Sequence, residues 1–108
     1  MEKVVEEIKK FSQEREWDQF HEPVNLAKSI VIEAAELLEC FQWNDVKFDK
    51  DNVIDELADV MNYCVLLALK LDVNIDDIIL AKIQKNKIKY PVEKAKGNYI
   101  KYNKLGGE

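Results

Sequence analysis

Four acidic residues form two pairs with the same spacing, Glu33-Ala-Ala-Glu36 and Glu56-Leu-Ala-Asp59. Residues three apart on a helix lie on one face with their Cβ atoms ~5–6 Å apart, so each pair can present two carboxylates together. Like charges ~6 Å apart at an effective dielectric of ~20 repel by ~3 kcal/mol, so a converging quartet must take up protons or bind cations. Oxygen ligands favour a hard ion, so we expect Mg²⁺ before Zn²⁺, with Mn²⁺ as the alternative to Mg²⁺.

The second acidic pair lies in a stretch that is otherwise close to wholly apolar. Between Leu57 and Leu69 the only charged side chain is Asp59. A helix that is apolar almost all round is buried in a core or an interface, so we expect these carboxylates to face inward. One such pair alone is typical of a solvated surface. Two pairs, one of them in an apolar helix, favour a metal site.

Hydrophobic spacing predicts four helices that would position these residues. They span about residues 2–16, from 23–25 to about 43, from 51–52 to 71–72, and about 75–89. Pro23 suits a first helical turn, and Pro91 ends the last helix. All three glycines come at or after Gly97, so nothing before that point resembles a strand-and-turn protein. The predicted fold class is all-α, a four-helix bundle completed by oligomerisation.

The chain length of 108 residues fits one domain. We expect a helical domain over residues 1–91, followed by a C-terminal extension, residues 92–108, that is flexible or packs on a neighbouring subunit. A core of this size with so apolar a third helix is expected to be completed by another copy of the chain. The predicted assembly is a homo-dimer or a larger homo-oligomer.

Polar side chains continue the apolar stripes of the predicted helices. Arg15 lies four residues beyond Phe11 in the first helix, and Tyr63 lies four residues beyond Asp59 in the third. The isoleucine stripe of the fourth helix continues as Lys82, Asn86 and Lys89. Phosphoryl chemistry needs cations that neutralise phosphate oxygens, basic side chains that hold the rest, and a carboxylate that orients water. The acidic pairs and the basic stripe together predict a metal-plus-polyphosphate site.

Composition excludes several classes of function. The chain has 21 acidic and 16 basic residues and a net charge of −5, which argues against a nucleic-acid polymer as the main partner. No apolar run reaches ~18 residues, and charges begin at the second residue, so we expect neither a membrane span nor a signal peptide. A cytoplasmic protein is expected. Cys40 and Cys64 have no CxxC partner, which favours reduced core cysteines over a disulfide or a metal ligand.

Two other interpretations of the acidic residues were weighed. A di-iron carboxylate bundle needs Glu-x-x-His pairs on two helices, and the only histidine, His21, lies in a connector. That interpretation fails. A non-catalytic helical module, either a nucleotide sensor or a protein-interaction bundle, could keep the acidic face for a structural cation or a basic partner helix. This second interpretation stays open.

Several short blocks, taken in order, resemble the all-α nucleoside triphosphate pyrophosphohydrolases of the MazG-like group, and among them the dCTP pyrophosphatases most. The resemblance runs from about residue 11 to residue 91. The blocks are Arg15-Glu-Trp17, Phe20-His21-x-Pro23-x-Asn25-Leu26, Glu33-x-x-Glu36-Leu37, Phe41-Gln42-Trp43, Glu56-Leu57-x-Asp59-Val60 with Tyr63, and Lys82-x-x-x-Asn86-x-x-Lys89-Tyr90-Pro91. One block alone would be weak evidence, whereas their shared order is specific.

The resemblance implies an enzyme that hydrolyses a nucleoside triphosphate between the α and β phosphates, for nucleotide-pool sanitation. The implied substrate is dCTP or a modified nucleotide. The implied Mg²⁺ ligands, which also form the catalytic centre, are Glu33, Glu36, Glu56 and Asp59. The implied phosphate contacts are Arg15, Lys82, Asn86 and Lys89. The residues implied to line the base and sugar pocket are Trp17, Trp43 and Tyr63.

The chain departs from the dCTP-type pattern at one position. Those enzymes have a histidine in the first helix that can approach the base, and the corresponding residue here is Ile8. The departure bears on the preference for a pyrimidine base. Known relatives assemble as dimers or tetramers, which agrees with the expectation that another subunit covers the third helix.

Overall fold

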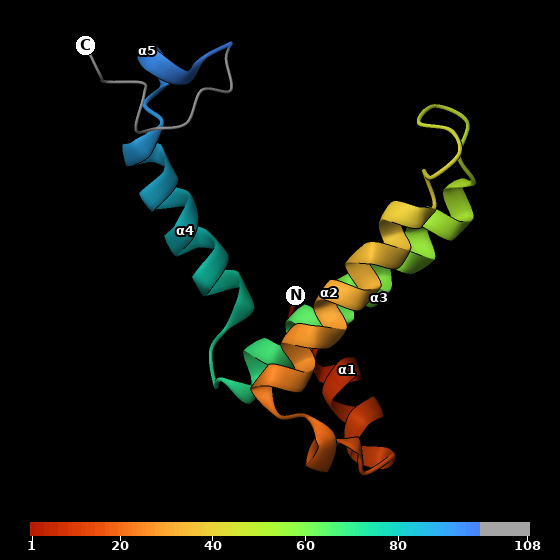
Figure 1. The fold of residues 1–108 in the computed structure, drawn as a ribbon. Coiled ribbons are helices and arrows are strands. Elements are labelled where there is room, and N and C mark those ends of the chain that lie inside the picture. Colours follow the sequence, from red (N-terminus) through yellow and green to blue (C-terminus); the bar gives the residue numbers. More distant parts are fainter. Residues whose placement is uncertain (98–108) are drawn as a thin grey trace. The chain divides into compact units, whose positions relative to one another are not determined.

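The computed structural model describes residues 1–97. Within this range the chain forms α1 (Glu2–Glu14), a short 3-10 helix η1 (Trp17–Phe20), α2 (Pro23–Glu39), α3 (Lys50–Lys70), α4 (Ile75–Lys89) and α5 (Val92–Ala95) (Figure 1). No strand occurs among these 97 residues, so the predicted all-α fold class is confirmed. None of the helices in this range is both long enough and apolar enough to cross a membrane.

The chain divides into two compact units. The first spans Met1–Asn74 and contains α1, η1, α2 and α3, whereas the second begins at Ile75 and contains α4 and α5. The predicted helical domain over residues 1–91 and extension over 92–108 stay a prediction. Most of that extension, from residue 98 onward, lies outside the described residues.

The first unit is built on a hairpin of α2 and α3, which lie side by side (Figure 1). Leu26 of α2 is buried with Val65, Leu66 and Ala68 of α3. Fully burying one large aliphatic side chain stabilises a fold by about 1.5–3 kcal/mol, so these contacts hold the hairpin together. Helix α1 packs against α3 and buries Ser12. The two helices that carry the acidic pairs are therefore neighbours.

Two helix ends differ from the sequence prediction because of local hydrogen bonds. Helix α2 ends at Glu39, since the next three N–H groups, those of Cys40, Phe41 and Gln42, donate to carbonyls three residues back at 3.2, 3.0 and 3.0 Å. Such bonds tighten the chain into a 3-10 turn. Helix α1 ends at Glu14, and Glu16 follows in the left-handed conformation (φ 56°) that leads the chain into η1. Helix α4 has the predicted bounds.

Helix α3 begins earlier than predicted. The Asp49 carboxylate accepts hydrogen bonds from the backbone N–H groups of Asp51 and Asn52 at 3.0 and 3.4 Å. Satisfying these otherwise unpaired donors makes Asp49 the N-cap, so the helix starts at Lys50 and not at residues 51–52. At the other end, Asp72 adopts the left-handed conformation (φ 57°) just beyond the last turn.

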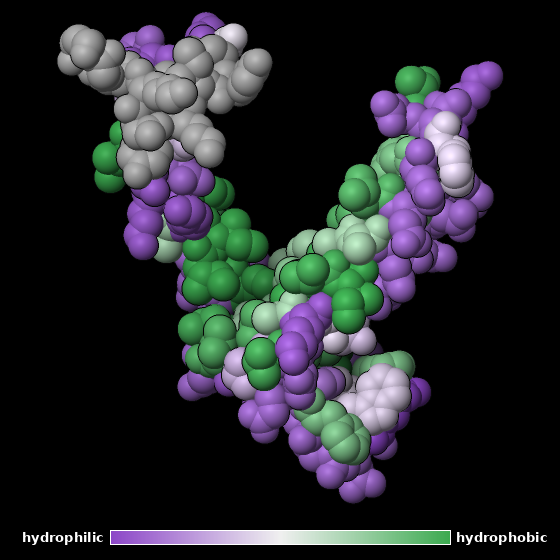
Figure 2. Space-filling view, viewed as in Figure 1, coloured by the Kyte–Doolittle hydropathy of each residue, from purple (hydrophilic) through white to green (hydrophobic). Residues whose placement is uncertain are grey.

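Apolar side chains are exposed along the hairpin, as the green surface over α2 and α3 in Figure 2 shows. On α2, Val31 and Leu38 are 68% and 71% exposed, and on α3, Ile54 and Leu57 are 50% and 48% exposed. Isolated exposed apolar residues are common, but a continuous band of them marks an interaction surface. Within a single chain, α3 is therefore only partly buried.

Candidate functional site

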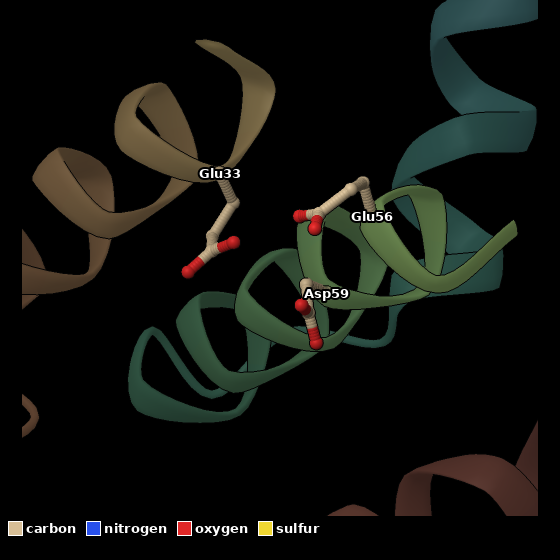
Figure 3. Close-up of side chains that lie close together, drawn as sticks. All are labelled: Glu33, Glu56 and Asp59. Carbon is tan, nitrogen blue, oxygen red and sulfur yellow. The ribbon is translucent and has the colours of Figure 1, made fainter. Parts of the chain in front are cut away.

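Helices α2 and α3 bring three of the four predicted carboxylates together. Glu33 of α2 points toward Glu56 and Asp59 of α3 (Figure 3). One carboxylate oxygen from each of the three lies within 4.8 Å of the others. Glu33 and Glu56 are half-buried, whereas Asp59 is exposed. We call Glu33, Glu56 and Asp59 the carboxylate cluster.

Glu36, the fourth predicted carboxylate, lies at the edge of this cluster. Its side chain is exposed, and it is outside the group of converging oxygens. It is nevertheless close enough to raise the pKa of both Glu33 and Glu56. Glu36 therefore belongs to the electrostatic surroundings of the cluster.

The electrostatics of the cluster favour the neutral form of two carboxyls. Burial raises the pKa of Glu33, with further contributions from the hydrogen bond to Glu36 and the negative charges of Glu36, Asp59 and Glu56. Burial likewise raises the pKa of Glu56, followed by the charge of Glu36 and the hydrogen bond to it. Since both groups resist ionisation, the cluster must hold protons or be neutralised by a cation.

Two oxygens of the cluster lack hydrogen-bond partners. The Oε2 atoms of Glu33 and Glu56 are buried and have no partner among the described residues. A buried acceptor without a partner costs ~1–3 kcal/mol, a cost that a bound cation removes. The donors are all carboxylate oxygens, which suits a hard divalent ion such as Mg²⁺. The residues present therefore fit a metal ion of this class.

Cys40 lies beside the cluster but does not belong to it. Its thiol donates to the carbonyl oxygen of Glu36 at 3.6 Å. Burial and the nearby charge of Glu56 raise the pKa of the Cys40 thiol, which disfavours the thiolate that would bind a metal. Both cysteines are free. Because both side chains are half-buried, the expectation of reduced core cysteines stays a prediction.

A cavity of about 420 Å³ adjoins the cluster at Asp59. Its walls come from α1 and the residue before it and from α3, and its lining residues are Met1, Val4, Ile8, Ala58, Asp59, Met61, Asn62 and Val65. The volume lies in the range of about 300–1,000 Å³ that is typical of small-molecule sites. Sequence reasoning missed Asn62, although its position three residues beyond Asp59 on one helix face was a usable signal.

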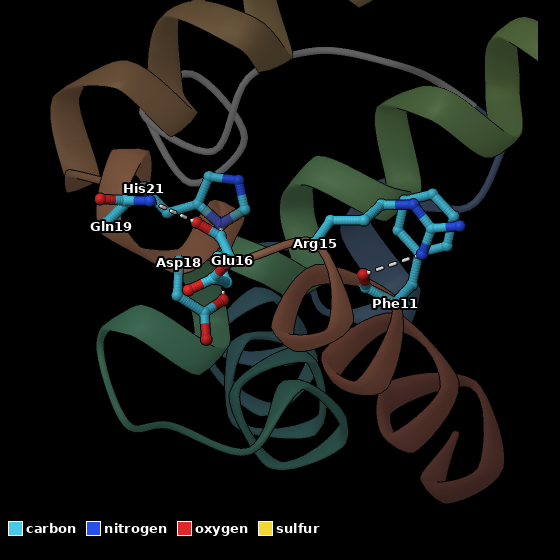
Figure 4. Close-up of polar contacts among 6 residues, drawn as sticks. All are labelled: Phe11, Arg15, Glu16, Asp18, Gln19 and His21. Carbon is cyan, nitrogen blue, oxygen red and sulfur yellow. Dashed lines mark hydrogen bonds and ion pairs between the residues drawn. The ribbon is translucent and has the colours of Figure 1, made fainter.

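Arg15 and Trp17 both contact Phe11, and their predicted roles in substrate binding stay predictions. The Arg15 guanidinium lies 3.7 Å above the centre of the Phe11 ring and donates to the Phe11 carbonyl at 3.1 Å (Figure 4). Trp17 packs edge-on against the same ring, with the centroids 5.6 Å apart. Cation–π and aromatic pairs of this kind stabilise by about 0.5–1.5 kcal/mol each. Neither Arg15 nor Trp17 lines the cavity beside Asp59.

The connector after α1 has its own polar contacts. His21 lies 3.9 Å from the Asp18 carboxylate, and the Gln19 amide donates to the Glu16 carbonyl at 2.9 Å (Figure 4). Both contacts link residues three apart, so they serve to hold η1. This agrees with a structural role for His21.

The other predicted residues come from the loop between α2 and α3, from α3 and from α4. Trp43 is 88% exposed in the loop between α2 and α3, which the Phe41–Phe48 ring pair closes at 4.8 Å. Tyr63 is half-buried on α3. Lys82, Asn86 and Lys89 follow one another on α4, which belongs to the second compact unit and is described by itself. Their assigned roles stay predictions.

Comparisons with known proteins agree with this geometry. A model of the MazG-like family matches residues 28–105. The dCTP pyrophosphatase 1 of Mus musculus is 36% identical over 104 residues, and that of Homo sapiens is 35% identical over 104 residues, each match covering 88% of this chain. The chain spans 61% of the length of these two relatives. The crystal structure of a pyrophosphatase from Archaeoglobus fulgidus DSM 4304 superposes with a TM-score of 0.74 at 36% identity, covering 84% of this chain and 92% of that one.

Proposed function

The chain belongs to the MazG-like family, and we propose that it is a nucleoside triphosphate pyrophosphohydrolase. It would hydrolyse the bond between the α and β phosphates and release a nucleoside monophosphate and pyrophosphate. The observation that carries this proposal is the carboxylate cluster. One oxygen from each of its three side chains lies within 4.8 Å of the others, and the half-buried Glu33 and Glu56 each have a buried oxygen without a partner among the described residues. Such a cluster is costly unless it binds a cation, and triphosphate substrates are bound through divalent cations.

Glu33, Glu36, Glu56 and Asp59 are the proposed Mg²⁺ ligands, with Mn²⁺ as the alternative ion. These residues would hold the ion, which would supply the positive charge that neutralises phosphate oxygens and activates water. One of the four carboxylates would orient the attacking water and accept its proton. Lys82 and Lys89 would stabilise the departing pyrophosphate.

The substrate we propose is dCTP or a modified nucleotide, since the relatives of known name are called dCTP pyrophosphatase 1. Removing surplus or non-standard nucleotides from the pool would be the cellular role, and the cytoplasm is the proposed compartment.

The protein should be incubated with Mg²⁺ and a panel of nucleotides, with pyrophosphate and orthophosphate assayed separately. Pyrophosphate release supports the proposal. Orthophosphate alone would indicate a different cleavage site, and no product across the panel would favour the non-catalytic module.

We expect Lys82→Ala to weaken dCTP binding by roughly 10- to 100-fold, because a charge-assisted hydrogen bond to phosphate would be lost. Binding of dCMP should change much less, since the monophosphate lacks the β and γ phosphates. Calorimetric titration of both nucleotides measures the difference. The control is Lys85→Ala, the same substitution on the same helix at a residue expected to be solvated. Equal losses for dCTP and dCMP would contradict the phosphate assignment.

A homo-dimer or homo-tetramer is the proposed assembly, because the exposed apolar band on α2 and α3 would cost free energy in water. Sedimentation at micromolar concentration should show a species larger than the monomer. Leu38→Lys, at a residue that is 71% exposed in the band, should shift this species toward the monomer. Val92→Lys, at a residue of α5 that is 72% exposed, is the matched control and should leave it unchanged. A wild-type chain that sediments as a stable monomer would disprove the proposed assembly.

A further inference from the structure

The cavity beside Asp59 contains one uncharged hydrogen-bonding side chain. Its lining includes the apolar side chains of Val4, Ile8, Met61 and Val65, together with the Asn62 amide. The only ionisable side chain in the lining is Asp59, which also belongs to the carboxylate cluster. The cavity is therefore a mainly apolar chamber that opens directly from the proposed phosphate and metal site.

The Asn62 amide is available to a ligand. Asn62 is half-buried, and its side chain makes no hydrogen bond within residues 1–97. An amide offers one acceptor and two donor hydrogens. A half-buried amide that faces a cavity and has no protein partner is suited to a ligand that presents both a donor and an acceptor.

The position of Asn62 along α3 places it beyond the phosphates. At 1.5 Å per residue, Asn62 lies ~4.5 Å further along the helix axis than Asp59, and Val65 lies ~9 Å further. A nucleotide whose phosphates approach the carboxylate cluster would therefore extend its nucleoside along this cavity. A nucleobase has apolar faces and a polar edge, which matches apolar walls with a single amide. A sugar, with hydroxyl groups on several sides, matches these walls less well.

We propose that Asn62 is a specificity-determining residue, whose amide hydrogen-bonds to the edge of the nucleobase while Ile8 and Met61 contact its faces. This inference rests on the proposed function, because it takes the occupant of the cavity to be the nucleoside part of the substrate. An asparagine amide can pair with two neighbouring groups on a base edge, one donor and one acceptor. The proposal assigns recognition of the base to Asn62 of α3. It does not assign that role to Trp17, which packs on Phe11.

The test compares Asn62→Leu with wild type, because leucine keeps the size of the side chain and removes the amide. The steady-state kcat/KM is measured by pyrophosphate release for dCTP, dTTP, dATP, dGTP and CTP, and the inhibition constant of inorganic tripolyphosphate is measured in parallel. Binding of the four deoxynucleoside monophosphates is measured calorimetrically in EDTA, which needs neither metal nor turnover. Asn52→Leu, the same substitution at an exposed position of α3 outside the cavity, is the matched control.

We expect Asn62→Leu to lower kcat/KM for the preferred base by roughly 10- to 100-fold, and that for the poorest base by no more than about threefold. The spread among the four bases should therefore shrink in both turnover and monophosphate binding, while tripolyphosphate inhibition is unchanged. If the leucine variant does not fold, Asn62→Ser removes the amide with a smaller change in polarity and serves the same comparison.

Two results would overturn the inference. The first is that the kcat/KM values of the four deoxynucleoside triphosphates keep their order and their ratios in Asn62→Leu, even if all four values fall by the same factor. The other is a changed ratio of dCTP to CTP with the base order retained, which would assign Asn62 to the sugar. If wild type releases no pyrophosphate from any nucleotide, the proposed function fails. The monophosphate titrations still decide the role of Asn62 in that case, since a base-dependent loss of binding in Asn62→Leu supports it and equal losses refute it.

Discussion

Replacing Glu56 by glutamine is expected to lower Mg²⁺-dependent pyrophosphate release by on the order of 10²- to 10⁴-fold while leaving the helices intact. Glu56 contributes a converging oxygen to the carboxylate cluster, and its buried Oε2 has no partner among the described residues. Glutamine keeps the size of the side chain, but it is neutral, and its NH₂ group cannot bind a cation in place of a carboxylate oxygen. The loss should appear in kcat, measured at saturating nucleotide, and circular dichroism should be unchanged.

The control for Glu56→Gln is Glu39→Gln, because Glu39 is an exposed glutamate on α2 that lies outside the cluster. Its activity should stay close to that of wild type. Undiminished activity in Glu56→Gln would remove the α3 pair from the mechanism.

The second expected result concerns stability against pH in the absence of metal. The folded-state pKa values of Glu33 and Glu56 lie above the ordinary value of 4.5, chiefly because of burial. The folded protein therefore binds these protons more tightly than the unfolded chain does. The stability that these groups contribute is fully present below pH 4.5 and is lost as the pH rises through the raised values.

The direction of this pH dependence predicts how the stability of Glu33→Gln compares with that of wild type in EDTA. Below pH 4.5 its free energy of unfolding should match that of wild type, since both carry a neutral group at position 33. Above pH 4.5 the variant should become the more stable protein, because wild type must ionise a buried carboxyl. Urea denaturation at several pH values measures the difference. A variant that is less stable than wild type at neutral pH would contradict this electrostatic account.

Mg²⁺ should reverse the order at neutral pH. A ligand that binds only the folded state stabilises it by about 2.7 kcal/mol at a hundred times its Kd. Wild type should gain this stability and Glu33→Gln should gain much less, because it lacks one converging oxygen. Glu39→Gln should gain as much as wild type. If Mg²⁺ and Mn²⁺ both leave the wild-type melting temperature unchanged, the cluster is not a site for these ions.

The surroundings of Arg15 could not be predicted from the sequence. The resemblance implied a contact with phosphate, and this role stays a prediction. In the structure its guanidinium lies on the Phe11 ring, and Trp17 packs against that ring from the side. Helical spacing places residues on a face, but it does not distinguish a ligand from an aromatic neighbour one turn away on the same face.

The sequence by itself determined the helices, since apolar spacing, Pro23 and Pro91 act locally along the chain. It also singled out the four carboxylates, because a spacing of three places each pair on one face of a helix. Only the tertiary structure decided that Glu33 approaches Glu56 and Asp59 while Glu36 stays at the edge, and that α1 and α3 enclose a cavity at Asn62. The physical reason is that helix periodicity is a property of one segment. Which faces meet depends on how side chains from distant segments pack together.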